Sequence, residues 1–160
     1  MKKIIYFIIS SLIMIGINAC SGYKPIFNSS NINFEISDYL IEGDEILGNQ
    51  IYYKLRNLSE KKNNVDAKNL YIKINVSKNK SAAAKDQAGK TLEYKIQLNT
   101  KFLVKDYLTD KELLNHTFTS SVIYKVQDQY SETAKLENKS INDLTKKTYQ
   151  DLLTKLIENI

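Results

Sequence analysis

The sequence is poor in the residues that carry most enzyme chemistry. It has one cysteine, one histidine (His116) and five scattered glycines among 160 residues. Without a second cysteine no disulfide framework can form, and zinc finds few of the nitrogen and sulfur ligands that it prefers. No phosphate-binding loop, dinucleotide fingerprint or nucleophile elbow occurs. We therefore expect no metal, no cofactor and no enzyme. Carboxylate-only catalysis is the one route left open, and His116 is expected to be an ordinary surface or partly buried side chain.

Arginine and proline occur once each, whereas lysine, asparagine and isoleucine abound. This bias is typical of an AT-rich coding sequence, which lowers the weight of any argument from lysine counts. The formal net charge is +5, and it falls to +3 when Lys2 and Lys3 are removed with the acid-free residues 1–19. So mild a positive charge does not indicate nucleic acid as a partner.

Residues 1–19 have the layout of a signal peptide that is cleaved after export. Lys2 and Lys3 form a positive start, the stretch from Ile4 to Ile17 is apolar, and Ala19 is small, as expected before a cleavage site. A transmembrane helix is the alternative. The apolar stretch is shorter than the roughly 20 residues that cross a bilayer core, which favours the signal.

Cys20 directly follows the small residue Ala19. The run Ile17-Asn18-Ala19-Cys20 resembles the bacterial lipobox, in which a diacylglycerol is attached to the cysteine sulfur before cleavage. Two or more acyl chains anchor a protein stably without spanning the bilayer. The alternative is that Cys20 remains an unmodified thiol. Ser21, in place of an aspartate, favours transfer to the outer membrane. The prediction is a lipoprotein anchored at Cys20 on the periplasmic side of the outer membrane.

The mature chain has the length of one domain with its own core. Residues 20–31 are expected to form a lipidated tether, and residues 32–160 a single domain. Its first strand is indicated by Ile32, Phe34 and Ile36, which alternate with polar residues.

A helix is predicted next, with Asp44 as its N-cap. Gly48 within this helix indicates close packing against another element, because glycine otherwise weakens a helix. The apolar residues of the helix recur at spacings of three and four, on one face: Leu47, Ile51, Leu55 and Leu58.

Three runs of alternating hydrophobicity predict an antiparallel meander with one apolar face. They are Leu70–Ser77, Leu92–Val104 and Thr117–Val126, separated by a thirteen-residue loop at Lys78–Lys90 and a turn near Asp106–Glu112. A loop of that length between two strands is typical of a functional or mobile segment.

The C-terminus changes to a helical period. Its apolar stripe predicts a long amphipathic helix from Ile141 to Ile160, which either extends back towards Glu132 or is interrupted between Asn138 and Asn142. The order is therefore β-α-β-β-β-α. The economical fold is an α+β two-layer sandwich, in which two helices pack on one face of a mainly antiparallel four-stranded sheet.

Two lysine-bearing surfaces are candidates for binding. One is the loop Lys78–Lys90. The other is the solvated sheet face, where alternation projects four lysines together: Lys73, Lys95, Lys101 and Lys105. Clustered ammonium groups bind phosphates, but an ordinary solvated face in a lysine-rich chain is the alternative.

The order of elements and several short motifs resemble the LptE family of lipopolysaccharide-assembly lipoproteins over nearly the whole chain. Cys20–Phe27 is similar to the C-G-[FY]-x-P-[LI]-[FY] opening of its alphaproteobacterial branch. Further matches are the helix Glu45–Leu58 with Asn49-Gln50, the hairpin run Gly89–Tyr94, and Tyr130–Ile160, in which Ala134 leads into the helix.

The resemblance implies an α/β sandwich whose partner is LptD, an outer-membrane β-barrel that encloses the lipoprotein as a plug. The implied role is assembly of that barrel and delivery of lipopolysaccharide to the cell surface. It also implies that lipopolysaccharide binds basic residues near the hairpin, here Lys85, Lys90 and Lys95, although the arginine common near the hairpin tip is missing. The competing hypothesis is another noncatalytic envelope lipoprotein, a pilot or assembly factor without lipopolysaccharide contact.

Overall fold

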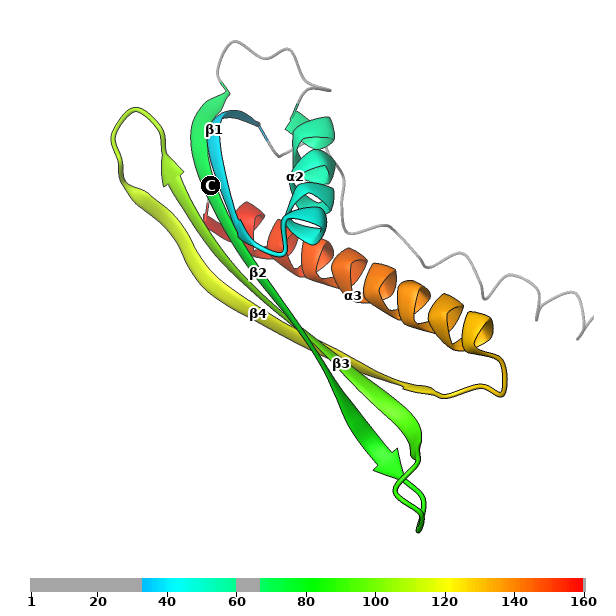
Figure 1. Ribbon diagram of the computed structural model, residues 1–160. Coiled ribbons are helices and arrows are strands. Elements are labelled where there is room, and N and C mark those ends of the chain that lie inside the picture. Colours follow the sequence, from blue (N-terminus) through cyan, green and yellow to red (C-terminus); the bar gives the residue numbers. More distant parts are fainter. Residues whose placement is uncertain (1–32, 60–66, 160) are drawn as a thin grey trace, which may run out of the picture. The chain divides into compact units, whose positions relative to one another are not determined.

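The protein folds as one sheet covered by two helices, in a computed structural model that describes residues 33–59 and 67–159. The elements occur in the predicted β-α-β-β-β-α order: β1 (Phe34–Gly43), α2 (Glu45–Ser59), β2 (Lys68–Lys85), β3 (Thr91–Asp106), β4 (Glu112–Lys125) and α3 (Tyr130–Asn159). Both helices lie on the same face of the sheet (Figure 1). The α+β two-layer sandwich is therefore confirmed. The predicted signal peptide, Cys20 and the tether up to residue 31 lie outside the described residues, as do Ile32 and Ile160.

The strands are ordered β1-β2-β3-β4, as in the sequence. β1 runs parallel to β2, whereas the other two pairs are antiparallel. The parallel pair follows from α2, because the helix carries the chain back so that Lys68 starts β2 beside Phe34. The sheet is mixed but mainly antiparallel, as predicted.

Asp44 caps α2 as the sequence predicts. Its side-chain Oδ1 accepts a hydrogen bond from the backbone N–H of Leu47 at 3.2 Å. Gly48 is the predicted point of close approach. A Cβ added there would lie 2.5 Å from Cγ2 of Ile41 on β1, so the absence of a side chain lets helix and strand meet.

The predicted loop Lys78–Lys90 is wrong. β2 continues to Lys85, and only residues 86–90 turn the chain. The reason lies in β3, whose backbone groups pair with β2 along nearly their whole length, as in Lys80↔Ile96. The turn closes on Asp86, whose Oδ1 accepts hydrogen bonds from the N–H groups of Ala88 (3.0 Å) and Lys90 (2.8 Å).

α3 is one continuous helix of 30 residues, so the longer of the two predicted forms is correct and no interruption occurs between Asn138 and Asn142. At 1.5 Å per residue it is about 45 Å long. Ser140 and Leu144 are both buried. The helix therefore stays packed against the rest of the fold along the segment that contains Asn138 and Asn142.

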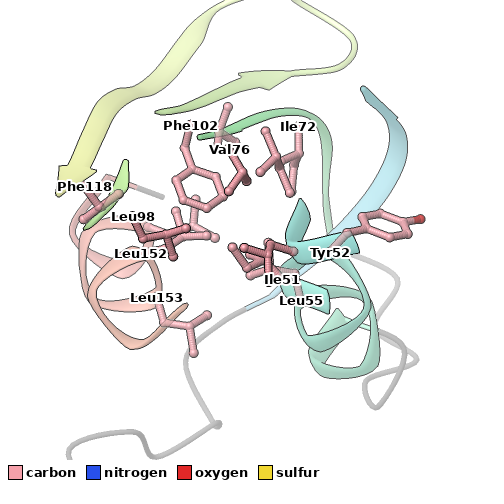
Figure 2. Close-up of a cluster of buried hydrophobic side chains, with 14 of the residues drawn as sticks. Ile51, Tyr52, Leu55, Ile72, Val76, Leu98, Phe102, Phe118, Leu152 and Leu153 are labelled. Carbon is pink, nitrogen blue, oxygen red and sulfur yellow. The ribbon is translucent and has the colours of Figure 1, made fainter. Parts of the chain in front are cut away.

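The core lies between the sheet and the two helices. Figure 2 shows side chains of the strands facing those of the helices. Each fully buried leucine or isoleucine contributes roughly 1.5–3 kcal/mol. The most buried include Ile51 and Leu55 of α2, Ile72 and Phe102 of the sheet, and Leu152 of α3, all with 0% exposure.

Gly43 joins β1 to α2 with φ of +81°, and a Cβ there would collide with the backbone carbonyl oxygen of Val76. Gly43→Ala should lower the free energy of unfolding by about 3 kcal/mol, the cost of left-handed backbone together with that collision. Gly89→Ala is the matched control, because Gly89 has φ of +84° but no neighbouring atom within 4 Å. In denaturant titrations, the free energy of unfolding of the Gly89→Ala control should fall by only about 1 kcal/mol. Equal losses in the two variants would contradict this account.

Candidate binding site at the hairpin end

β2 and β3 run on past the helices and form a projecting hairpin arm, defined here as residues 78–95 (Figure 1). On β2, the alternation between buried and accessible residues stops at Val76, and Ser77 to Ala83 are all exposed. The arm therefore has no apolar layer of its own beneath this part of β2.

A polar clamp connects the base of the arm to α3. We define it as Lys80, Tyr94, Tyr124 and Glu137, which come from β2, β3, β4 and α3 respectively. The Lys80 ammonium forms an ion pair with Glu137, and the Tyr124 hydroxyl donates a hydrogen bond to Glu137 Oε2 at 2.9 Å. Lys80 Nζ also lies 4.4 Å from the centroid of the Tyr94 ring, within range of a cation–π interaction.

The clamp perturbs the protonation of its members. For Glu137, burial alone would raise the pKa, but hydrogen bonds from Lys80 and Tyr124 and the positive charges of Lys80 and Lys78 outweigh burial. The pKa of Glu137 is consequently lowered. The hydrogen bond to Glu137 raises the pKa of Lys80 despite desolvation of the ammonium. Both groups are held in their charged forms.

Beside the clamp lies a cavity of about 530 Å³, which we call the hairpin cavity. It is formed where the arm, the β4–α3 connection and the first turns of α3 meet. Its lining combines apolar and aromatic side chains with charges: Lys80, Lys90, Thr91, Leu92, Tyr94, Val126, Gln127, Asp128, Tyr130, Thr133, Ala134 and Glu137.

The hairpin cavity is chemically suited to an amphiphile. Leu92 and Tyr130 are 45% and 88% exposed, which leaves apolar surface available to a ligand. Lys90 belongs to the same lining and takes part in no ion pair among residues 33–59 and 67–159. Apolar walls with a few placed polar groups are typical of small-molecule sites, and an ammonium at the lining suits an anionic headgroup.

The three lysines suggested by the family resemblance are not on one surface. Lys90 lies in the turn of the hairpin and lines the cavity. Lys95 alternates with Tyr94 and the buried Ile96, so it lies on the opposite, helix-free face of the sheet. Lys85 is exposed at the end of β2, paired in register with Thr91.

The second lysine set shares the helix-free face, as alternation predicts, but only part of it is clustered. Lys73 and Lys101 line one pocket together with Glu42, whereas Lys95 lies apart. Lys73 pairs with Glu42 at 2.7 Å and Lys105 with Asp110 at 2.9 Å. The hydrogen bond from Lys73 is the largest cause of the lowered pKa of Glu42. Lys95 and Lys101 are six residues apart on one strand, about 20 Å. Much of this face is instead neutral and polar.

His116 is exposed, and its ring meets Phe118 edge-on at 4.6 Å between centroids, so it is the ordinary histidine expected. Within the described part of the chain, no three His, Cys, Asp or Glu residues are grouped to hold a metal ion. No helix there has the length and apolar character needed to cross a membrane.

Sequence reasoning missed Lys80, Tyr124 and Glu137, because it placed Lys80 in a loop and assigned no role to the other two. A usable signal was the length of the predicted third strand. A strand as long as Leu92–Val104 leaves its backbone N–H and C=O groups unpaired unless the preceding strand is equally long. Applied to the preceding strand, that requirement would have predicted that it extends beyond Lys80.

No protein-family model matches this chain, and no curated protein matches it in sequence. Solved structures of other proteins do match this chain in fold. The uncharacterized lipoprotein B of Nitrosomonas europaea matches with a TM-score of 0.60 and 17% identity over 82% of this chain and 88% of its own. Rare lipoprotein B of Shewanella oneidensis matches with a TM-score of 0.56 and 14% identity over 76% and 94%. At these identities the comparison shows the fold, and this chain has the fold of those two lipoproteins.

Glu137→Gln should weaken the polar clamp and lower the free energy of unfolding at pH 7 by about 1 kcal/mol or less, since the ion pair is partly exposed. The folded-state pKa of Glu137 is lowered, so its stabilisation is present above the unfolded-state value and lost as pH falls through the folded-state value. The difference from wild type should therefore be full at pH 7 and shrink as the pH falls below about 4.3, the ordinary pKa of glutamate. Denaturant titrations at pH 7 and at a series of lower pH values test this.

The control is Asp143→Asn, which removes a negative charge from an exposed position of the same helix. Amide hydrogen exchange in residues 78–85 should accelerate in Glu137→Gln and stay unchanged in the control. An equal stability loss in both variants would count against the clamp.

Proposed function

We propose that this protein is a lipid-anchored outer-membrane lipoprotein that assists lipopolysaccharide transport, as plug and assembly partner of an LptD-type β-barrel. The fold supports this proposal, because the LptE family that the motifs resemble is an α/β sandwich of two helices on a four-stranded sheet. The two similar solved structures are of lipoproteins. Cys20 would carry the acyl chains, on the periplasmic side of the membrane.

The hairpin cavity is the observation that carries the lipopolysaccharide part of the proposal. Lipopolysaccharide combines acyl chains with phosphate groups. Leu92, Val126 and Tyr130 offer apolar contact to the former, and Lys90 offers a cation to the latter. Lys80 and Lys90 are the two lysines of the lining. Because the charge of Lys80 is neutralised by its ion pair with Glu137, Lys90 is the lysine that can bind a phosphate.

The helix-free face of the sheet supports the barrel part. Its middle contains one lysine, Lys101, which lies in register between Asn75 and Thr117, and is otherwise formed by uncharged hydrogen-bonding side chains: Asn75, Ser77, Asn79, Gln97, Asn99, Thr117, Thr119 and Ser121. Such a surface is suited to the polar inner wall of a barrel, where hydrogen bonds form without the cost of burying unpaired charges. The proposal is of a binding protein. No histidine or cysteine lines the hairpin cavity, so the histidine-based nucleophile pairs used by many acyl-transfer enzymes have no basis there.

A pull-down of the tagged lipoprotein from detergent-solubilised outer membrane tests the partnership. We expect one large β-barrel protein in a stoichiometric ratio. The double variant Thr117→Glu/Ser121→Glu places charges on the helix-free face and should lose the barrel, whereas Gln150→Glu on an exposed turn of α3 should retain it. Recovery of the wild-type protein alone, indifferent to lipopolysaccharide, would favour the pilot or assembly-factor alternative.

Binding of purified lipopolysaccharide tests the site. Lys90→Gln should weaken binding about 3–10-fold, as expected for one lost charge-assisted contact to phosphate. Lys95→Gln, on the helix-free face, is the matched control and should change affinity little. Replacing Lys85, Lys90 and Lys95 together should weaken binding at least as much as Lys90→Gln. An equal loss in Lys90→Gln and Lys95→Gln would refute the cavity as the binding site.

A further inference from the structure

The turn between β3 and β4 exposes two bulky apolar side chains. Tyr107 is 51% exposed and Leu108 is 78% exposed. Leucine at the tip of a tight turn gains nothing from packing there, and polar residues or glycine are the usual occupants of such positions. The pair is therefore a feature that the fold itself does not explain.

Hydrogen bonds to Asp106 fix this turn in place. Its Oδ1 accepts from the N–H groups of Leu108 (3.1 Å) and Thr109 (2.9 Å) and from the Thr109 hydroxyl (2.9 Å). The backbone and side-chain bonds from Thr109 are the largest causes of the lowered pKa of the Asp106 carboxyl. Both apolar side chains are thus presented outward by a preorganised backbone.

The turn lies next to the point where the N-terminal segment enters the fold. Lys68 N–H donates to Asn33 O at 3.1 Å, and Tyr107 N–H donates to the adjoining Asn69 O at 2.8 Å. Asn33 and Tyr107 are therefore about two strand spacings apart, roughly 10 Å. Figure 1 shows the β3–β4 turn at the end of the sheet opposite the tip of the hairpin arm.

The charges around the turn largely cancel, so that the turn carries no marked negative charge. Asp110 pairs with Lys105 at 2.9 Å, and the positive charge of Lys68 acts on Asp106. Lys111 and Glu112, which are both exposed, follow and offset each other. A tyrosine, a leucine and a neighbouring lysine form the combination that membrane interfaces favour.

We propose that the Tyr107–Leu108 turn inserts into the interface of the membrane that carries the lipid anchor. The inference rests on one part of the proposed function, the acylation of Cys20, and not on lipopolysaccharide or the barrel. Twelve residues lie between Cys20 and Asn33, so the two residues are at most about 45 Å apart. A tether that short keeps the turn at high effective concentration near the bilayer, so two side chains suffice as a second contact.

Before the lipoprotein joins a barrel, this contact would orient the sandwich. The β3–β4 turn and the first residue of β1 would rest at the bilayer surface, and the hairpin cavity, at the other end of the sheet, would face away from it. A protein held by its acyl chains alone would have no such fixed orientation.

Depth-dependent quenching of a single fluorophore tests the insertion. Leu108→Cys and Ala88→Cys are each labelled with an environment-sensitive fluorophore in the full mature lipoprotein. Both positions are exposed turn residues, at opposite ends of the sheet. The proteins are bound to phosphatidylethanolamine–phosphatidylglycerol vesicles that contain lipids with a quencher on the acyl chain. We expect a loss of fluorescence about twofold or more larger for Leu108→Cys than for Ala88→Cys.

Equal, weak quenching of both labels on vesicle-bound protein would overturn the inserted turn and leave the lipid anchor intact. The parent chain serves as a second readout, because an acylated Cys20 does not react with the label. A parent chain that labels at Cys20 and stays off the vesicles would overturn the anchor and the inserted turn together. A third outcome is strong quenching at Leu108→Cys in a protein that binds neither lipopolysaccharide nor a barrel. That outcome would support the inserted turn and refute the rest of the proposed function.

Discussion

The structure depends on the pairing of β2 with β3 from Leu70↔Asp106 to Lys85↔Thr91. This ladder is longer than the layer of helices that covers it. Where α2 and α3 lie against it, alternate side chains such as Ile72 and Phe102 are fully buried. Beyond that region the ladder continues on backbone hydrogen bonds with little apolar cover. The projecting arm, the polar clamp and the cavity beside it are all consequences of this mismatch in length.

The two ends of the sandwich consequently have different physical characters. One end contains α2 and the shared core, whose burial supplies most of the stability. The other end is held by an ion pair and a tyrosine hydroxyl, interactions that are individually weak when partly exposed. The cavity at the second end costs the fold little, because the core does not rely on Leu92 or Tyr130. This division is compatible with the proposed binding of a large amphiphile at that end.

Sequence patterns predicted the elements best where burial imposes a period. Leu70 to Val76 and Leu92 to Val104 alternate because one face of the sheet is buried, and residues 141–156 repeat at three and four because one face of α3 is. The pattern failed between Lys78 and Lys85, where both faces of the strand are accessible and no hydrophobic period exists to mark it. The lysines proposed to bind lipopolysaccharide were predicted from a family motif, which carries no information about the two faces of a strand. Alternation along β3 separates Lys95 from Lys90.

The sequence by itself determined the layered architecture, the helix cap at Asp44 and the close contact at Gly48, because each depends on residues near in the chain or on a repeating period. It also contains the small-residue–Cys20 junction, and its single histidine and single cysteine limit the catalytic pairs that these residue types can form. Only the tertiary structure decided that β1 lies parallel to β2, that Lys80 meets Glu137 across 57 residues, and that a cavity opens beside them. The physical reason is that these features arise from pairing between distant segments, which no local pattern records.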